Sequence, residues 1–400
     1  MGKFDHLFYE FVPQETHWGD WCVSPQAYFR GEADMSGANM TVGFQVFKAP
    51  VYLEREPHFH REEEYLVFLG AVLPDVFSSW DAEVEFFMGK DLDSMEKITI
   101  TAPTIVRVPA GMWHSPLDFK RVDKPVLFQA ASQSGKFGSV KQRKNADGTI
   151  DFIYIGDEAR ACVLDDKKRC NYCGQCFGEA TADNVTSAEL FSKPGADFDQ
   201  YWTVLDRPQS QYITDLVCVL PKEETNWGPW CPTPQAYFRG ETYMTAGCKY
   251  HVGFQIFTGP NDMEEAHFHQ GVDEYVFFMG ADPMNIFDFD AEIDFYIGDH
   301  PDRMEVVKIT KPTVVRLPPT IWHSPILFRN VNKPLLFQAA FFDGTWGTIT
   351  RHYNEKGEPF YNYTGDNVRW CVMDPEKRCN ICGKCFANFN PDAPTTPLIK

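Results

Sequence analysis

The sequence contains no apolar run that approaches the ~18 residues of a membrane-spanning helix. The segment Met1–Phe11 also lacks the apolar stretch and the small-residue cleavage site of a secretory signal. The Ser or Thr that completes a myristoylation signal does not follow Met1 and Gly2. We therefore expect a cytoplasmic protein with no membrane partner.

Runs of Lys and Arg are absent too. Acidic residues outnumber basic residues by 56 to 37, so the formal net charge is −19. An average field of this sign repels the phosphates of nucleic acid, and we expect no nucleic-acid partner. The acidic residues are expected to form a solvated surface. The expected partner is a small-molecule substrate, and assembly into a homo-oligomer is left open.

No segment shows the apolar period of a helix over three turns. The 34 Phe, 28 Gly and 28 Pro instead favour short strands that end at turns. Strands are expected at Thr41–Phe47, Glu64–Leu69, Val84–Met88, Thr104–Val108 and Val126–Ala130. Many short strands predict an all-β fold, with each sheet closed into a sandwich or barrel that leaves few free edges.

The two halves of the chain repeat each other. Pro25-Gln-Ala-Tyr-Phe-Arg-Gly31 returns unchanged as Pro234–Gly240, at an offset of 209 residues that rises to 210 over two short stretches. Such self-similarity predicts two homologous lobes. We expect lobe 1 at residues 1–178, a polar linker at 179–209, lobe 2 at 210–389 and a proline-rich extended arm at 390–400. Each lobe ends in a Cys-rich tail.

Three histidines and one carboxylate recur in each half. His58 and His60 are two residues apart, so in a strand both side chains point to the same side. Glu64 lies four residues beyond His60 and shares that face, and His114 arrives from a distant strand after a turn. The corresponding residues of lobe 2 are His267, His269, Glu274 and His323.

The second half differs in one spacing. Glu274 lies five residues beyond His269, which in a regular strand would turn it outward. We expect a bulge or turn near Gly271 to restore the inward direction. Of the 11 histidines, these six are the ones that have a histidine counterpart in the other half.

These patterns resemble the two motifs of the cupin family. His58-x-His60-x3-Glu64-x5-Gly70 and Pro109-x-Gly111-x2-His114 match them, and lobe 2 repeats them with Thr320 in place of the motif glycine. The resemblance covers the barrel core of both halves, but neither the Trp-rich N-terminal segment nor the cysteine tails. It implies two tandem double-stranded β-helix barrels, that is, a bicupin, each with a three-His, one-Glu metal site.

Three imidazoles and a carboxylate suit a mid-row divalent ion, and we expect Fe, with Mn, Ni, Co, Cu and Zn as alternatives. With four protein ligands, an octahedral ion keeps two positions for exogenous ligands such as substrate and dioxygen. A four-coordinate Zn ion would have no open position for substrate.

Eight of the 12 cysteines form two matched sets. Four closely spaced thiols in an intracellular protein favour a metal over disulfides. We expect structural Zn in each set, as a clip that closes its own lobe. An iron–sulfur cluster and reduced or disulfide-paired thiols are the alternatives. The remaining matched pair, Cys22 and Cys231, is expected to be buried. The two sets are Cys162, Cys170, Cys173 and Cys176, and Cys371, Cys379, Cys382 and Cys385.

The resemblance includes dioxygenases, decarboxylases and isomerases as well as non-catalytic binding proteins, so the fold alone does not give the activity. Because both ligand sets are whole, we favour an enzyme, and the leading hypothesis is an oxidoreductase of dioxygenase type that acts on a small oxygenated, possibly aromatic compound. A non-oxidative lyase, decarboxylase or isomerase is the first alternative, and a metal-dependent binding or regulatory protein is the second.

Four residues are candidates for catalytic roles. Glu64 and Glu274 would accept protons on leaving the ion. Arg107 and Arg316 precede the second motif and would clamp a substrate carboxylate, with a structural ion pair as the alternative. Arg55 lies where oxalate-decarboxylating bicupins carry a clamping arginine, and Glu264 is taken as its lobe 2 counterpart.

Overall fold

The computed structural model describes residues 2–156 and 214–365, apart from short gaps. The gaps are residues 16–18, 55–56, 61, 72–74, 137, 145–146, 148–149, 224–227, 244–246, 270–271, 320, 343–346 and 354. Both cysteine sets, the linker at 179–209 and the arm at 390–400 lie outside the described residues, as do Arg55, Gly271 and Thr320.

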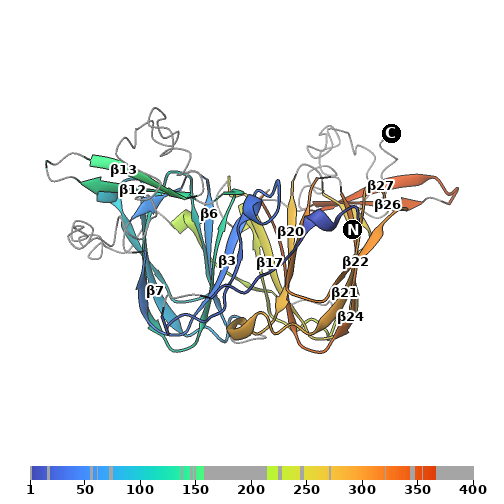
Figure 1. Cartoon of the computed structure of the whole chain (residues 1–400), viewed down its shortest axis with the longest axis horizontal. Helices are drawn as coiled ribbons and strands as arrows, with labels where there is room; N and C mark the ends of the chain where they lie inside the picture. The colour runs from blue at the N-terminus through green and yellow to red at the C-terminus, as the bar shows by residue number, and fades with distance from the viewer. Residues whose placement is uncertain are drawn as a thin grey trace. The chain divides into compact units, whose positions relative to one another are not determined.

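Lobe 1 contains two antiparallel sheets that face each other (Figure 1). The first has the strand order β14-β9-β6-β11-β3-β2. Its strands are β14 (Val217–Val219), β9 (Thr104–Val108), β6 (Glu64–Gly70), β11 (Val126–Ser132), β3 (Thr41–Phe47) and β2 (Ala27–Phe29). The second has the order β13-β12-β5-β10-β7-β8, with β4 also paired to β10. Its strands are β13 (Ile150–Gly156), β12 (Gly138–Lys144), β5 (His58–Phe59), β10 (Trp113–Val122), β7 (Ala82–Gly89), β8 (Glu96–Ile100) and β4 (Val51–Leu53).

Lobe 2 repeats this arrangement. Its first sheet runs β1-β23-β20-β25-β17-β16-β15. The strands are β1 (Phe8–Glu10), β23 (Thr313–Leu317), β20 (Glu274–Gly280), β25 (Leu335–Phe342), β17 (Tyr250–Phe257), β16 (Gln235–Arg239) and β15 (Lys222–Glu223). Its second sheet runs β22-β21-β24-β19-β26-β27, with β18 paired to β24. The strands are β22 (Glu305–Ile309), β21 (Ala291–Gly298), β24 (Trp322–Val331), β19 (His267–Phe268), β26 (Gly347–Tyr353), β27 (Pro359–Gly365) and β18 (Asn261–Met263).

The all-β prediction is confirmed. All five segments expected as strands are strands, and Thr41–Phe47 and Thr104–Val108 have the expected bounds. The described helices are short. They are η1 (Asp5–Leu7), η2 (Gly31–Ala33), η3 (Leu92–Ser94), η5 (Thr214–Leu216), η6 (Pro283–Asn285) and α3 (Gly240–Tyr243).

Aromatic rings fill the space between the two sheets of each lobe. In lobe 1 the Phe47 ring packs edge-on against Phe119 at 4.7 Å between centroids and stacks on Phe128 at 5.7 Å. In lobe 2 Phe257 makes the same contacts with Phe328 at 4.9 Å and Phe337 at 5.2 Å. Because large apolar side chains contribute most to burial, these clusters stabilise each barrel from within.

The structure assigns two edge strands differently from the predicted boundaries. The compact unit of lobe 2 includes Met1–Val12, because β1 pairs antiparallel with β23. The unit of lobe 1 extends to Val219, because β14 pairs with β9. Each of these strands covers a sheet edge that would otherwise expose unpaired backbone groups.

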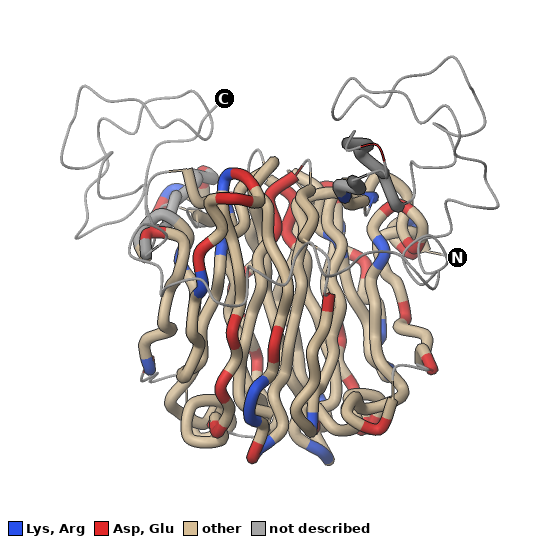
Figure 2. The backbone as a smooth tube through the Cα atoms, turned by 90° about the vertical axis from the view of Figure 1, so that its left-hand side faces the viewer, with Lys and Arg blue, Asp and Glu red and all other residues tan. Residues whose placement is uncertain are grey.

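Charged residues are interspersed along the strands rather than gathered by sign (Figure 2). Acidic positions are the more frequent, and several basic side chains lie in ion pairs, such as Lys97 with Glu85 at 2.7 Å. No helix among the described residues is long and apolar enough to span a membrane.

Candidate metal centre

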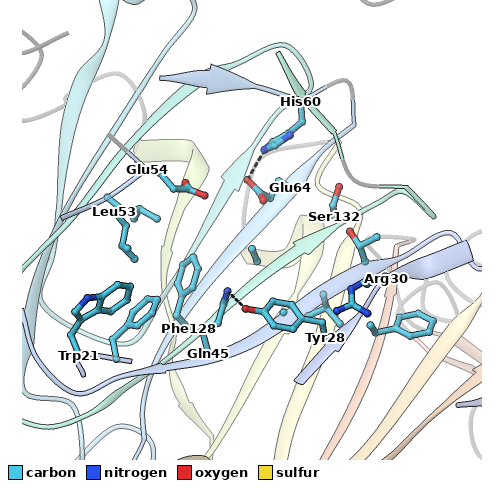
Figure 3. Close-up of a pocket in the computed structure, with 17 residues that line it drawn as sticks. Trp21, Tyr28, Arg30, Gln45, Leu53, Glu54, His60, Glu64, Phe128 and Ser132 are labelled. Atoms are coloured by element: carbon cyan, nitrogen blue, oxygen red, sulfur yellow. Dashed lines mark hydrogen bonds and ion pairs between the residues drawn. The ribbon is translucent and has the colours of Figure 1, made fainter. Parts of the chain in front are cut away.

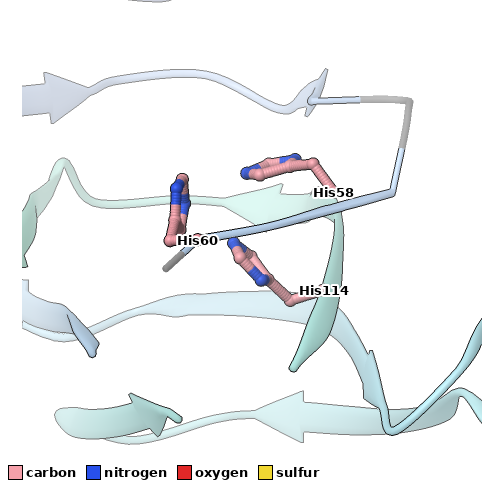
Figure 4. Close-up of side chains that lie close together, drawn as sticks. All are labelled: His58, His60 and His114. Atoms are coloured by element: carbon pink, nitrogen blue, oxygen red, sulfur yellow. The ribbon is translucent and has the colours of Figure 1, made fainter. Parts of the chain in front are cut away.

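The structure brings the three histidines of lobe 1 together. His58 lies in β5 and pairs in register with His114 in β10, and His60 follows β5 directly. Their rings lie 4.3 to 4.9 Å apart between centroids (Figure 4). One nitrogen of each ring lies within 4.8 Å of the others, and all three residues are buried.

Backbone carbonyls fix the direction in which the imidazoles point. His60 Nδ1 donates to Gly138 O at 2.7 Å, and His114 Nδ1 donates to Met112 O at 3.0 Å. A proton on Nδ1 leaves the Nε2 lone pair free to bind an ion, which is the usual orientation of metal-ligating histidines. Gly111, with φ of +76°, donates from its N–H to His60 O at 2.8 Å and so ties the turn before His114 to the first motif.

Glu64 completes the group at the start of β6. Its Oε2 atom lies 3.4 Å from His60 Nε2 and 3.3 Å from His114 Nε2. Burial raises the pKa of the Glu64 carboxyl, but the two imidazoles outweigh this and hold the pKa well below its usual range. Burial likewise lowers the pKa of His60, and the Glu64 carboxylate raises it to about 8.

Lobe 2 reproduces the geometry. His267 in β19 pairs with His323 in β24, and Glu274 Oε2 lies 3.0 Å from His269 Nε2 and 3.1 Å from His323 Nε2. Glu274 therefore faces inward, as predicted despite the extra residue before it. Nδ1 of each imidazole donates to a carbonyl, at Glu265, Gly347 and Ile321 respectively.

The donor set fits a divalent transition-metal ion. Donor atoms 3.0 to 3.4 Å apart match ligands that each lie about 2.1 Å from one shared ion. The Nε2 atoms of His114 and His323 are buried and form no hydrogen bond of regular geometry, although a glutamate oxygen lies 3.3 or 3.1 Å away. A buried nitrogen that lacks a well-oriented partner is costly, and a bound ion would satisfy both nitrogens.

The two barrels share the same strand order. Each encloses its own group of three histidines and one glutamate, which come from the same motif positions. The chain has the fold of a duplicated cupin.

Searches against family models and against curated proteins found no match. Among solved structures, the chain resembles a mutant of Bacillus subtilis oxalate decarboxylase at 13% identity and a TM-score of 0.49, covering 92% of this chain and 81% of that one. It resembles Lactobacillus farciminis oxalate decarboxylase in a formate complex at 12% identity and a TM-score of 0.48, over 94% and 92% of the chains. Vicilin from Corylus avellana is similar at 10% identity and a TM-score of 0.46, over 85% and 86%.

A cavity of about 770 Å³ opens onto the lobe 1 group. His60 and Glu64 lie over its middle, Trp21, Leu53 and Phe128 at one end, and Arg30 and Ser132 at the other (Figure 3). Its size and mostly apolar wall are typical of sites for small organic ligands.

In lobe 2 two rings take the positions of Thr41 and Ser132, which line the lobe 1 cavity. Ser132 pairs with Thr41 and Glu64 in lobe 1, and Phe341 pairs with His251 and Glu274 at the same register in lobe 2. The Phe341 ring stacks on His251 at 4.7 Å between centroids and on His269 at 5.8 Å. Burial, with the nearby Arg239 guanidinium, lowers the pKa of His251 to about 3, so the ring is neutral and packs as an apolar group.

The two predicted clamp arginines lie in ion pairs. Arg107 is paired with Glu63, and Arg316 Nε lies 2.7 Å from Asp273 Oδ2. Neither Arg107 nor Glu63 is among the residues that line the lobe 1 cavity. These contacts favour the alternative in which each arginine forms a structural ion pair instead of binding substrate. Each pair then stabilises the strand that carries the candidate ligand glutamate.

The structure also corrects the counterpart of Glu264. Glu54 and Glu264 both follow a short strand, β4 and β18, and both have positive φ, 45° and 62°. Glu264 therefore corresponds to Glu54 and not to Arg55, because lobe 1 has one additional residue before the first histidine. Glu54 lines the cavity and accepts a hydrogen bond from Ser115 Oγ at 2.9 Å.

Aromatic side chains beside the ligands do not line the cavity. Phe59 packs against Trp113 at 5.0 Å between centroids, in a cluster with Phe87 and Met95. The aromatic rings that do line the cavity include Tyr28, Phe47 and Phe128, and the sequence analysis assigned these residues no role. A repeated heptad, residues 25–31, was the signal that could have found Tyr28 and Arg30, since it returns unchanged in lobe 2.

Cys22 and Cys231 are buried, as expected. Burial raises the pKa of the Cys22 thiol to about 11, so it is a neutral group bonded to Gln26.

The metal content of the purified protein tests the predicted metal sites directly. Protein purified without chelator should contain about four transition-metal ions per chain, two at the His/Glu groups and two at the cysteine sets. His114→Ala should remove about one ion, because only two imidazoles then remain beside the buried carboxylate. Element analysis that finds less than one ion per chain in the wild type would contradict the assignment.

Proposed function

We propose that the protein is a metal-dependent enzyme whose reaction site is the lobe 1 cavity. The observation that carries this proposal is the opening of a large cavity onto His60 and Glu64. In lobe 2 the rings of His251 and Phe341 occupy the corresponding space. Lobe 2 is then mainly structural, and its metal ion would brace the barrel.

A bound divalent ion would supply Lewis acidity and a template for oxygen ligands. The other steps belong to side chains of lobe 1. Trp21, Phe47 and Phe128 would orient a flat substrate and exclude water from its apolar part. Glu54, held by Ser115, would move a proton to or from a substrate oxygen or carbon. Glu64 is a second candidate for this role.

The reaction that we favour is oxidative and of dioxygenase type, on a small oxygenated aromatic compound. Iron is the ion that suits this chemistry, with the other mid-row ions as alternatives. The aromatic wall of the cavity supports such a substrate.

A second reaction is favoured by one observation. Glu54 projects a carboxyl group into the cavity beside the ligand residues. Such a group could return a proton to carbon after loss of carbon dioxide, as a non-oxidative decarboxylase requires.

One assay separates the two reactions. Metal-loaded protein is incubated with catechols, flavonols and carboxylic acids, and dioxygen uptake is measured beside carbon dioxide release under nitrogen. Dioxygen uptake that depends on protein and metal supports the dioxygenase, and anaerobic release of carbon dioxide supports the decarboxylase. If every compound fails with protein shown to contain metal, the enzyme proposal is wrong and a binding role replaces it.

A further inference from the structure

The repeated heptad ends in an arginine whose surroundings differ between the lobes. In lobe 2 the Arg239 guanidinium is held by both carboxylate oxygens of Glu223, with Nη2 at 2.7 Å from Oε2, and by the hydroxyl of Tyr243. In lobe 1 the corresponding Arg30 meets a neutral partner, with Nη2 donating to Gln14 Oε1 at 2.7 Å. The positive charge is balanced within lobe 2 but not within lobe 1.

Arg30 is free to meet an anion at the cavity. Among the described residues, no carboxylate lies within ion-pair distance of its guanidinium. Asp34, which takes the place of Tyr243, accepts instead from the Arg30 backbone N–H at 2.7 Å. The guanidinium lies 5.9 Å from the centroid of the Tyr28 ring, which also lines the cavity. This contact helps to hold the side chain at the cavity wall.

The same end of the cavity carries the hydroxyl groups of Thr41 and Ser132, which pair across β3 and β11. In lobe 2 these positions are His251 and Phe341. The three differences between the lobes therefore act together. Lobe 1 has an uncompensated cation, two hydroxyl donors and open space, where lobe 2 has a neutralised cation and two packed rings.

The opposite end of the cavity is apolar. Trp21, Phe47, Leu53, Leu117 and Phe128 form its wall. A ligand that satisfies both ends has one anionic group and an apolar body, and its middle faces His60 and Glu64 (Figure 3). A volume of about 770 Å³ leaves room for such a body, and a compact dicarboxylate would leave the apolar end unfilled.

We propose that the lobe 1 cavity selects monocarboxylates with an aromatic or extended apolar body, and that Arg30 binds the carboxylate. The guanidinium presents two parallel N–H donors to such a group, and Thr41 and Ser132 add hydroxyl donors. This inference rests on the proposed function in so far as it places the substrate in the same cavity.

The test uses trans-cinnamate and its neutral amide, trans-cinnamamide, as matched probes in calorimetric titrations of the full-length protein. The wild type should bind cinnamate at least about tenfold more tightly than the amide. Arg30→Gln should abolish that preference and leave binding of the amide unchanged. Gln14→Glu should do the same without removing the arginine, because it introduces the lobe 2 pairing. Arg239→Gln is the matched control and should keep the preference.

Three results would overturn the proposal: no preference in the wild type, no binding of either probe, or a preference that survives Arg30→Gln. The failure of the proposed function is separable from these. His114→Ala should lack the lobe 1 ion yet keep the preference for cinnamate, since Arg30 and the apolar wall are intact. A preserved preference in a protein without turnover supports the carboxylate site and counts only against the enzyme proposal.

Discussion

Replacing His60 by alanine should reduce turnover by at least about 100-fold, whereas His269→Ala should leave turnover within about threefold of the wild type. Both substitutions remove one imidazole from an equivalent group of ligands. His60, however, lines the open cavity of lobe 1, and His269 lies under the Phe341 ring in lobe 2. Substrate can therefore reach the first group, and packed side chains cover the second.

The measurement is the steady-state rate on whichever compound the dioxygen and carbon dioxide assays identify, with metal content determined on the same samples. Each variant should lose about one metal ion per chain, which shows that the two substitutions are equally damaging to their own sites. Equal loss of turnover from both variants, with both proteins folded, would contradict a single reaction site.

Phe341→Ser should lower the free energy of unfolding of lobe 2 by about 3–5 kcal/mol. The Phe341 side chain is 2% exposed and stacks on two imidazole rings, so its removal leaves a cavity inside the barrel. The smaller serine side chain cannot fill that cavity. Urea unfolding, monitored by hydrogen exchange of the backbone amides in β17 and β25, measures the loss of unfolding free energy in lobe 2.

The reciprocal variant is the control. Ser132→Phe introduces the lobe 2 side chain into lobe 1, where it should obstruct the cavity beside Glu64 and abolish binding of cinnamate. A loss of less than about 1 kcal/mol in Phe341→Ser would show that the ring does not support the barrel. Undiminished binding of cinnamate to Ser132→Phe would show that this end of the cavity is not used.

Sequence reasoning identified the candidate metal ligands because their arrangement depends on local geometry. Alternation along a strand places His58 and His60 on one side, and the repeat identifies the same pair at His267 and His269. The third imidazole of each lobe could be included because its motif recurs. The structure then shows why the rings point inward, through carbonyl acceptors such as Gly138 O that no spacing reveals.

Sequence reasoning assigned the role of a substrate clamp to two arginines that the structure shows in ion pairs. Arg107 and Arg316 precede the second motif, but each is committed to an acidic neighbour that lies 43 or 44 residues away in sequence. Arg30 had no assigned role, although it ends a heptad that is identical in both halves. The carboxylate site that we propose at Arg30 depends on Gln14 in place of Glu223, and only the folded structure brings these two positions to the arginines.

The sequence by itself determined the duplication, the strand-rich lobes and the two sets of His and Glu ligands, because periodicity and internal repetition are local properties. Tertiary structure alone decided which lobe each edge strand joins. β1 and β14 occupy the same place in the repeat, and each pairs with the same strand of the other half, β1 with β23 and β14 with β9. The repeat does not reveal this exchange, because backbone groups at a sheet edge can pair with a strand from either half. Tertiary structure also decided that two hydroxyl side chains meet beside the lobe 1 cavity and two rings meet at the same place in lobe 2, because Thr41 and Ser132, or His251 and Phe341, come together only across paired strands.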